Sequence, residues 1–157
     1  MKVKIITGDL LDQPCDAIIN PWNRNIIPWW LLLPHGVSGA IKRKAGLQPF
    51  IELGKYGPIP LGKAVVTSAG NLPYKAIIHV VGINGFWRAS KISIQDSVRS
   101  AIELAHKLEI KSIAFPIIGS GAGGFPVTNA EGIMLATFSQ ISSTVEVTLV
   151  RYSSSKK

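Results

Sequence analysis

Six short segments rich in valine and isoleucine are spread along the chain and predict β-strands. They cover residues 2–7, 16–20, 64–68, 76–81, 112–118 and 144–150. Several are apolar at consecutive rather than alternate positions, which is typical of strands covered by helices on both faces of a largely parallel or mixed sheet.

Apolar side chains recur every three or four residues in two longer segments, which therefore predict amphipathic helices. The first helix is expected over residues 90–108, with one apolar stripe made by Ile94, Val98, Ala101, Ile102, Ala105 and Leu108. The second is expected to begin at Thr128, because Thr128 and Glu131 have the spacing of a capping box. A shorter helix is predicted over residues 37–44.

Strands and helices alternate after about residue 75, which favours an α/β fold. The simplest architecture is a three-layer α/β/α sandwich with a mixed, largely parallel sheet, formed by one domain over residues 1–152. Residues 153–157 (SSSKK) are expected to be a frayed tail.

The composition of the 157-residue chain limits the compartment and the classes of binding partner that we expect. A single cysteine, Cys15, excludes an internal disulfide and a multi-cysteine zinc site and suits a reducing cytoplasm, so a metal is not expected. No cofactor is expected either. The longest apolar run, residues 26–34, contains two prolines and is too short to span a bilayer, so no membrane partner is expected. The 17 Lys and Arg against 9 Asp and Glu give a net charge of +8, which points to an anionic partner. The charge alone does not say whether that partner is a small anionic ligand, a nucleic acid or an acidic membrane surface.

A glycine-rich segment, Gly119–Gly124 (GSGAGG), directly follows a predicted strand and precedes the helix expected at Thr128. Glycines let backbone N–H groups approach a phosphate, and a helix N-terminus favours negative charge. A Rossmann dinucleotide fingerprint is disfavoured, because only one helix and one strand remain after this segment. A Walker A loop is excluded, because the chain has no G-K-[ST] sequence.

A second strand end carries similar chemistry. Asn20–Asn23 (NPWN) ends a strand, and Gly36–Gly39 (GVSG) opens a helix after an apolar loop. Two such loops can converge on one diphosphate beyond the carboxyl ends of the strands. Asn23 offers a donor and an acceptor to sugar hydroxyls, although a turn residue beside Pro21 explains it equally well. Asp9, after the first strand, is either a turn or cap residue or an acceptor for an exocyclic amine such as that of adenine.

Five segments, in this order, resemble the macrodomain family. They are Gly8–Leu10 (GDL), Asp16–Asn23 (DAIINPWN), Gly36–Gly46 (GVSGAIKRKAG), Asn71–Gly82 (NLPYKAIIHVVG) and Ser112–Pro126 (SIAFPIIGSGAGGFP). The resemblance covers essentially the whole chain. It implies a protein that binds ADP-ribose, free or attached to protein or nucleic acid. In many members it also implies a metal-independent enzyme that removes ADP-ribose or deacetylates O-acetyl-ADP-ribose.

The resemblance also implies roles for single residues. Asp9, beside the Leu10 backbone, would hold the adenine amine, and Tyr152 would lie against adenine. Asn23 would face the distal ribose as a candidate catalytic residue, and Asn20 is counted among the ligand-binding residues. The diphosphate would be held by one loop made by Gly36, Val37 and Ser38 and by a second made by Ser120, Gly121, Ala122 and Gly123.

The chain departs from the hydrolytic MacroD-type branch of that family at three positions. Ser38 stands where that branch has an aspartate that positions water, Lys42 where it has a histidine, and Gly123 where it has an aromatic residue. Neither serine nor a protonated lysine is a general base at neutral pH. Binding of ADP-ribose is therefore the main expectation, and hydrolysis or deacetylation stays open. The alternative is a basic nucleic-acid-binding domain without ADP-ribose activity.

The histidines and tryptophans have plainer interpretations. His79 lies in an apolar strand and is expected to be a hydrogen-bonded core residue, and His106 is expected to be solvated. His35 adjoins the first phosphate loop and has a minor claim to function. The apolar insert with Trp22, Trp29 and Trp30 either caps the core or forms a lid or partner surface.

Overall fold

The six predicted strands form one sheet. The structure, a computed structural model, describes residues 1–22, 36–84, 88–121 and 124–153. The strand order is β1-β6-β5-β2-β4-β3. Every pair of neighbours is parallel except β3 and β4, which are antiparallel. The bounds are β1 Val3–Gly8, β2 Ala17–Pro21, β3 Ala64–Thr67, β4 Ala76–Val80, β5 Ser112–Pro116 and β6 Glu146–Tyr152.

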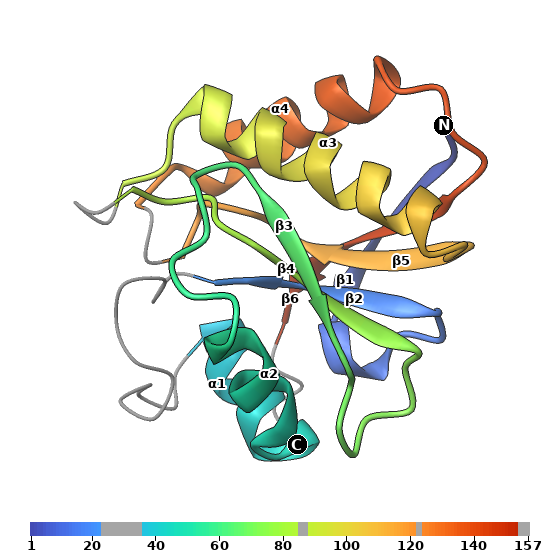
Figure 1. Ribbon diagram of the computed structural model, residues 1–157. Coiled ribbons are helices and arrows are strands. Elements are labelled where there is room, and N and C mark those ends of the chain that lie inside the picture. The colour runs from blue at the N-terminus through green and yellow to red at the C-terminus, as the bar shows by residue number, and fades with distance from the viewer. Residues whose placement is uncertain (23–35, 85–87, 122–123, 154–157) are drawn as a thin grey trace.

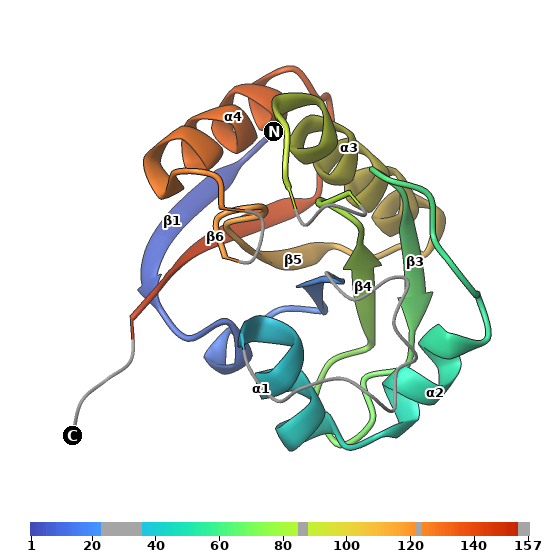
Figure 2. The same cartoon turned by 90° about the vertical axis from the view of Figure 1, so that its left-hand side faces the viewer.

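Helices cover both faces of this sheet, which confirms the predicted three-layer α/β/α sandwich. Helices α3 (Lys91–Lys107) and α4 (Val127–Ser139) pack on one face, and α1 (Gly36–Ala45) and α2 (Gln48–Gly54) lie on the other (Figures 1 and 2). A short 3-10 helix, η1 (Leu10–Asp12), follows β1. Among the helices that the structure describes, none is long and apolar enough to cross a membrane.

Two hydrophobic cores, one on each face, hold the layers together. Under α3 and α4, the rings of Phe115 and Phe138 meet edge to face with centroids 5.2 Å apart. Under α1 and α2, Ile18, Phe50 and Ile77 are fully buried. The central strands bury side chains on both faces, as their continuous apolar runs predicted, and each fully buried aliphatic side chain contributes about 1.5–3 kcal/mol.

The local structure differs from the prediction at two helices. The predicted capping box at Thr128 is wrong: α4 begins at Val127 with Pro126 as its N-cap, and a proline side chain has no acceptor, so Thr128 and Glu131 lie inside the helix and not at the box positions. The Glu131 carboxylate pairs with Arg151 instead. A capping box does exist at α3, where Ser90 and Ser93 bond reciprocally. Helix α2 was not predicted, because its seven residues are too few to show a helical period.

Candidate ligand site at the carboxyl edge of the sheet

The five parallel strands all end at the same edge of the sheet. The ends of β1, β2 and β5 therefore lie at one edge, together with the end of β6 (Figure 2). The first turn of α1 reaches this edge too, because the Ser38 hydroxyl lies 3.2 Å from the Pro21 carbonyl at the end of β2. The fold thus brings together the predicted residues Asp9, Leu10, Gly36, Val37, Ser38, Ser120, Gly121 and Tyr152.

Asp9 caps the 3-10 helix that follows β1. Its Oδ1 accepts a hydrogen bond of 2.9 Å from the Leu11 amide, and its carbonyl accepts one of 2.8 Å from the Gln13 side chain. The cap interpretation of Asp9 is therefore confirmed. Oδ2 accepts no hydrogen bond from the described residues, so the cap leaves one carboxylate oxygen for a donor such as an exocyclic amine.

Tyr152 lies beside Asp9 at the end of the neighbouring strand. In the β1–β6 register Tyr152 is paired with Gly8, and the Ser153 amide donates to the Gly8 carbonyl over 3.1 Å. The Tyr152 side chain is 77% exposed. An aromatic ring with that exposure offers a surface on which a planar base can stack.

Two glycines after β5, Gly119 and Gly121, differ in what their surroundings require. Gly119 has φ +85°, and a Cβ there would lie 2.8 Å from the Ala89 Cβ, so this glycine is required by the turn and by packing. The Phe125 amide donates to the Gly119 carbonyl and closes the loop. Gly121, by contrast, has no positive φ, and a Cβ there would meet nothing within 4 Å. The space beside Gly121 that a side chain would occupy is therefore open.

The start of α1 presents main-chain donors to the same edge. The first N–H groups of a helix have no intrahelical acceptor and carry the positive end of the helix dipole, so they favour an anion. The Ser38 side chain is turned inward: it is 9% exposed, and its hydroxyl lies 2.7 Å from Asn20 Oδ1. Its hydroxyl is therefore not aimed at a water on the ligand side.

Asn20 and His79 form a buried polar pair beneath this helix start. Both side chains are 0% exposed, and Asn20 Nδ2 lies 2.9 Å from His79 Nδ1. Burial lowers the pKa of His79 to about 3, so the imidazole is neutral at physiological pH. The interpretation of His79 as a hydrogen-bonded core residue is confirmed. Ligand contact by Asn20 stays a prediction, and its side chain reaches the site only through Ser38.

Several predicted residues lie outside the described part of the chain: Asn23, Ala122, Gly123, His35, Trp29 and Trp30. Of the apolar insert, Trp22 is described. It is 4% exposed, and its ring centroid lies 5.9 Å from that of Phe50. Trp22 therefore caps the core under α1 and α2, as the plainer interpretation of the insert predicts.

Two polar features were missed by the sequence patterns. Arg151 forms a two-point ion pair with Glu131, with an Nε to Oε2 distance of 2.8 Å, and this pair lowers the pKa of Glu131. Their separation of twenty residues leaves no periodic signal. The second missed feature is a hydrogen bond between the ring of His106, which is exposed as predicted, and the Ser143 hydroxyl.

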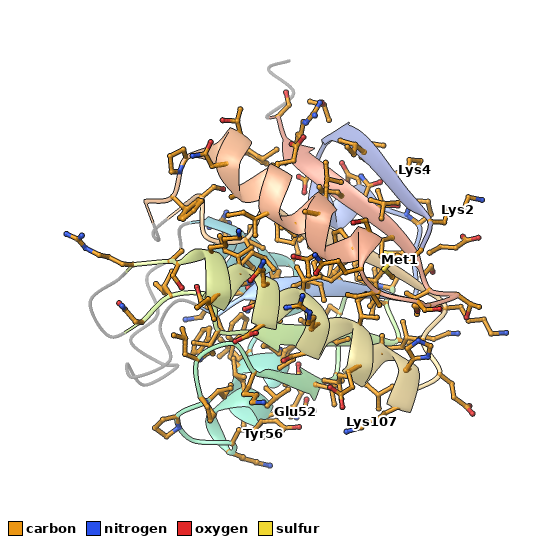
Figure 3. All side chains as sticks on the ribbon, turned by 90° about the horizontal axis from the view of Figure 1, so that it is seen from above. Met1, Lys2, Lys4, Glu52, Tyr56 and Lys107 are labelled. Atoms are coloured by element: carbon orange, nitrogen blue, oxygen red, sulfur yellow. The ribbon has the colours of Figure 1, made fainter. Side chains whose placement is uncertain are left out.

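A cavity of about 280 Å³ lies away from this edge, over the outer strand β3. It is lined by Glu52, Lys55, Tyr56 and Val66. Figure 3 shows Glu52 and Tyr56 near one another on the α2 side of the molecule, opposite Lys2 and Lys4 of the β1 side. Within the described residues, no three His, Cys, Asp or Glu side chains gather as a metal ion would need.

Known proteins similar to this chain match it over most of its length. A family model described as Macro domain matches residues 19–134. A macro domain-containing protein of Caldanaerobacter subterraneus subsp. tengcongensis is 39% identical, covering 97% of this chain and 89% of its own. An O-acetyl-ADP-ribose deacetylase of Escherichia fergusonii is 36% identical, covering 88% and 78%. The Oceanobacillus iheyensis macrodomain, solved with ADP, matches with a TM-score of 0.80 and 29% identity, covering 96% and 83%.

Proposed function

Because the chain belongs to the macro domain family, we propose that it binds ADP-ribose, free or attached to a macromolecule, at the carboxyl edge of the sheet. The observation that carries this proposal is the convergence of two open main-chain segments, the start of α1 and Gly121, beside Asp9 and Tyr152. One relative is named O-acetyl-ADP-ribose deacetylase, and a similar macrodomain was solved with ADP, so both support the same class of ligand.

Each end of the ligand has its own residues. Asp9 accepts the adenine amine on Oδ2, with the Leu10 main chain beside it, and Tyr152 covers the base. The diphosphate lies between two loops, one formed by Gly36, Val37 and Ser38 and the other by Ser120, Gly121, Ala122 and Gly123. Asn23 faces the distal ribose and is the candidate catalytic residue.

Turnover of O-acetyl-ADP-ribose or of an ADP-ribosyl linkage is the second candidate activity. A relative named O-acetyl-ADP-ribose deacetylase, which is 36% identical over 88% of this chain, favours it. The inward hydroxyl of Ser38 argues against a general base at that position, because it donates to Asn20. Turnover would then rely on Asn23 with the substrate's own phosphates to hold the water, or on Lys42 or His35 in an unfamiliar role.

Calorimetry with ADP-ribose tests binding directly. We expect one site per chain, with binding lost in Asp9→Ala and retained in Asp12→Ala, a neighbouring carboxylate in the same 3-10 helix. Absence of heat at millimolar ADP-ribose would refute the proposal. Turnover would be established by release of acetate from O-acetyl-ADP-ribose, or of ADP-ribose from modified protein or DNA, provided that Asn23→Ala abolishes the release.

Salt dependence separates this proposal from a basic nucleic-acid-binding domain. Binding through backbone phosphates falls steeply with added salt, because each neutralised phosphate releases a counterion. The affinity for ADP-ribose held by main-chain donors should fall far less with added salt. A steep salt response toward unmodified DNA, with no effect of Asp9→Ala, would support the nucleic-acid alternative.

We place this binding in the cytoplasm. The single thiol, Cys15, has no partner for a disulfide within the chain. Burial raises its pKa to about 11, so the thiol stays protonated and unreactive at neutral pH.

A further inference from the structure

A row of polar side chains crosses three adjacent strands on the face under α1 and α2. Asn20 on β2 and His79 on β4 are register partners, and Thr67 lies on β3. His79 Nε2 is 2.8 Å from Thr67 Oγ1, and Phe50 of α2 packs its ring edge against the imidazole, with centroids 6.3 Å apart. The surrounding core is aliphatic and aromatic, so the partners of these polar groups are one another and nearby main-chain carbonyls.

The hydrogen-bond geometry gives this row a direction. The Thr67 hydroxyl has one proton, which lies toward the Ser68 carbonyl at 2.9 Å, so Thr67 Oγ1 accepts from His79 Nε2–H. His79 Nδ1 is then an acceptor for Asn20 Nδ2, and Asn20 Oδ1 accepts from the Ser38 hydroxyl. The opposite direction would end on the longer 3.2 Å contact from Ser38 to the Pro21 carbonyl, so it is disfavoured.

Every polar atom in the row is satisfied, which makes the position of Ser38 specific. Across the described residues, no buried side-chain nitrogen or oxygen lacks a partner. A shift of the first turn of α1 would separate Ser38 Oγ from Asn20 Oδ1 and leave a buried acceptor without a partner, which is unfavourable because the acceptor has lost its hydration as well. The row therefore holds this turn at one height above the sheet.

We propose that Asn20 and His79 are positioning residues of the ligand site, which fix the first turn of α1 through the Ser38 hydroxyl so that its main-chain donors meet the diphosphate. This inference rests on the proposed function. It assigns to Asn20 and His79 a role through Ser38 and no contact with the ligand. This role requires the neutral His79 tautomer with hydrogen on Nε2, because only that form accepts a hydrogen bond from Asn20 while it donates one to Thr67.

Two substitutions remove the row at different distances from the ligand. Ser38→Ala deletes the last bond, and His79→Leu deletes the middle of the row, where no ligand atom reaches. We expect each to weaken ADP-ribose binding by about tenfold, the equivalent of one lost hydrogen bond. His79→Gln keeps an acceptor and a donor on one side chain and is expected to restore most of the affinity that His79→Leu loses.

A matched control separates positioning from plain stability. Ser97→Ala on α3 also removes a fully buried hydroxyl that bonds a main-chain carbonyl, here that of Val81, but in the core on the other face. We expect it to lower the melting temperature without changing the dissociation constant. If Ser38→Ala lowers the melting temperature but leaves the dissociation constant unchanged, as Ser97→Ala does, the positioning role is refuted.

The same measurements separate the two proposals. Wild-type protein that binds no ADP-ribose would refute the proposed function and the positioning role together. Wild-type binding with unchanged affinity in both Ser38→Ala and His79→Leu would refute the positioning role alone. Nitrogen-15 NMR of the His79 ring gives an independent reading: we expect the Nε2–H tautomer, and an Nδ1–H tautomer would overturn the direction of the row.

Discussion

Replacing His79 with glutamine should flatten the acid limb of the protein's stability. Burial lowers the pKa of His79 from 6.5 to about 3, so between those pH values the unfolded chain binds one more proton than the native protein. The stability that depends on neutral His79 is complete above pH 6.5 and is lost progressively as the pH falls. Glutamine takes up no proton, so it removes this dependence.

The size of the effect follows from the pKa difference. One proton of difference changes the free energy of unfolding by about 1.4 kcal/mol per pH unit, so two units below the unfolded pKa the loss is about 2.7 kcal/mol. Carboxylates whose pKa values are lowered in the fold, such as Asp16 and Glu131, add to the acid limb of both proteins alike. Their contribution therefore cancels in the difference between wild type and variant.

Urea unfolding followed by tryptophan fluorescence at a series of pH values measures this difference. The stability gap between wild type and His79→Gln should shrink steadily as the pH falls below 6.5. Whatever glutamine costs at neutral pH shifts the whole curve and does not alter its slope. Parallel curves for the two proteins would show that His79 takes up its proton in the fold as readily as in the unfolded chain, and would refute the reasoning.

Three further outcomes are expected. Gly121→Val should abolish ADP-ribose binding at a nearly unchanged melting temperature, because a Cβ there would meet nothing within 4 Å. Gly132→Ala, equally open but inside α4, should leave binding unchanged and raise the melting temperature slightly, because alanine is favoured over glycine in a helix interior. Gly119→Ala should instead destabilise the fold in a thermal melt, because its φ of +85° and the contact with Ala89 leave no room for a Cβ. Ser90→Ala should cost about 1 kcal/mol in urea unfolding, since it removes one half of a capping box.

The sheet was predictable because strands that are buried on both faces have continuous apolar runs in the sequence. All six predicted strands exist, with ends displaced by one or two residues. Helix α3 was predictable because its seventeen residues show the helical period several times. Helix α2 has seven residues with a proline near its start, and its identity is decided by the packing of Phe50 against the core, which no local pattern reveals.

The site was predictable only as far as chain order determines it. Loops after parallel strands must meet at one edge, so the convergence of Asp9, Gly121 and Tyr152 follows from topology. The inward turn of Ser38 could not be predicted, because it depends on a partner, Asn20, eighteen residues away and on the depth of α1 over the sheet. The same holds for Glu131: its spacing from Thr128 favoured a capping box, but the helix begins before that box, at Val127, and the Glu131 carboxylate pairs with the distant Arg151.

The parallel pairing of β1 with β6 decides how the protein can be attached to other molecules. Met1 precedes the start of β1 and lies at the edge opposite the ligand site, whereas Ser153 follows the end of β6 and bonds to Gly8 beside Asp9 (Figure 2). A tag, surface linker or fused domain joined before Met1 leaves the site facing solution. One joined after Ser153 begins next to Asp9, where adenine is proposed to bind, so it is expected to compete for space with a bulky ADP-ribosylated target.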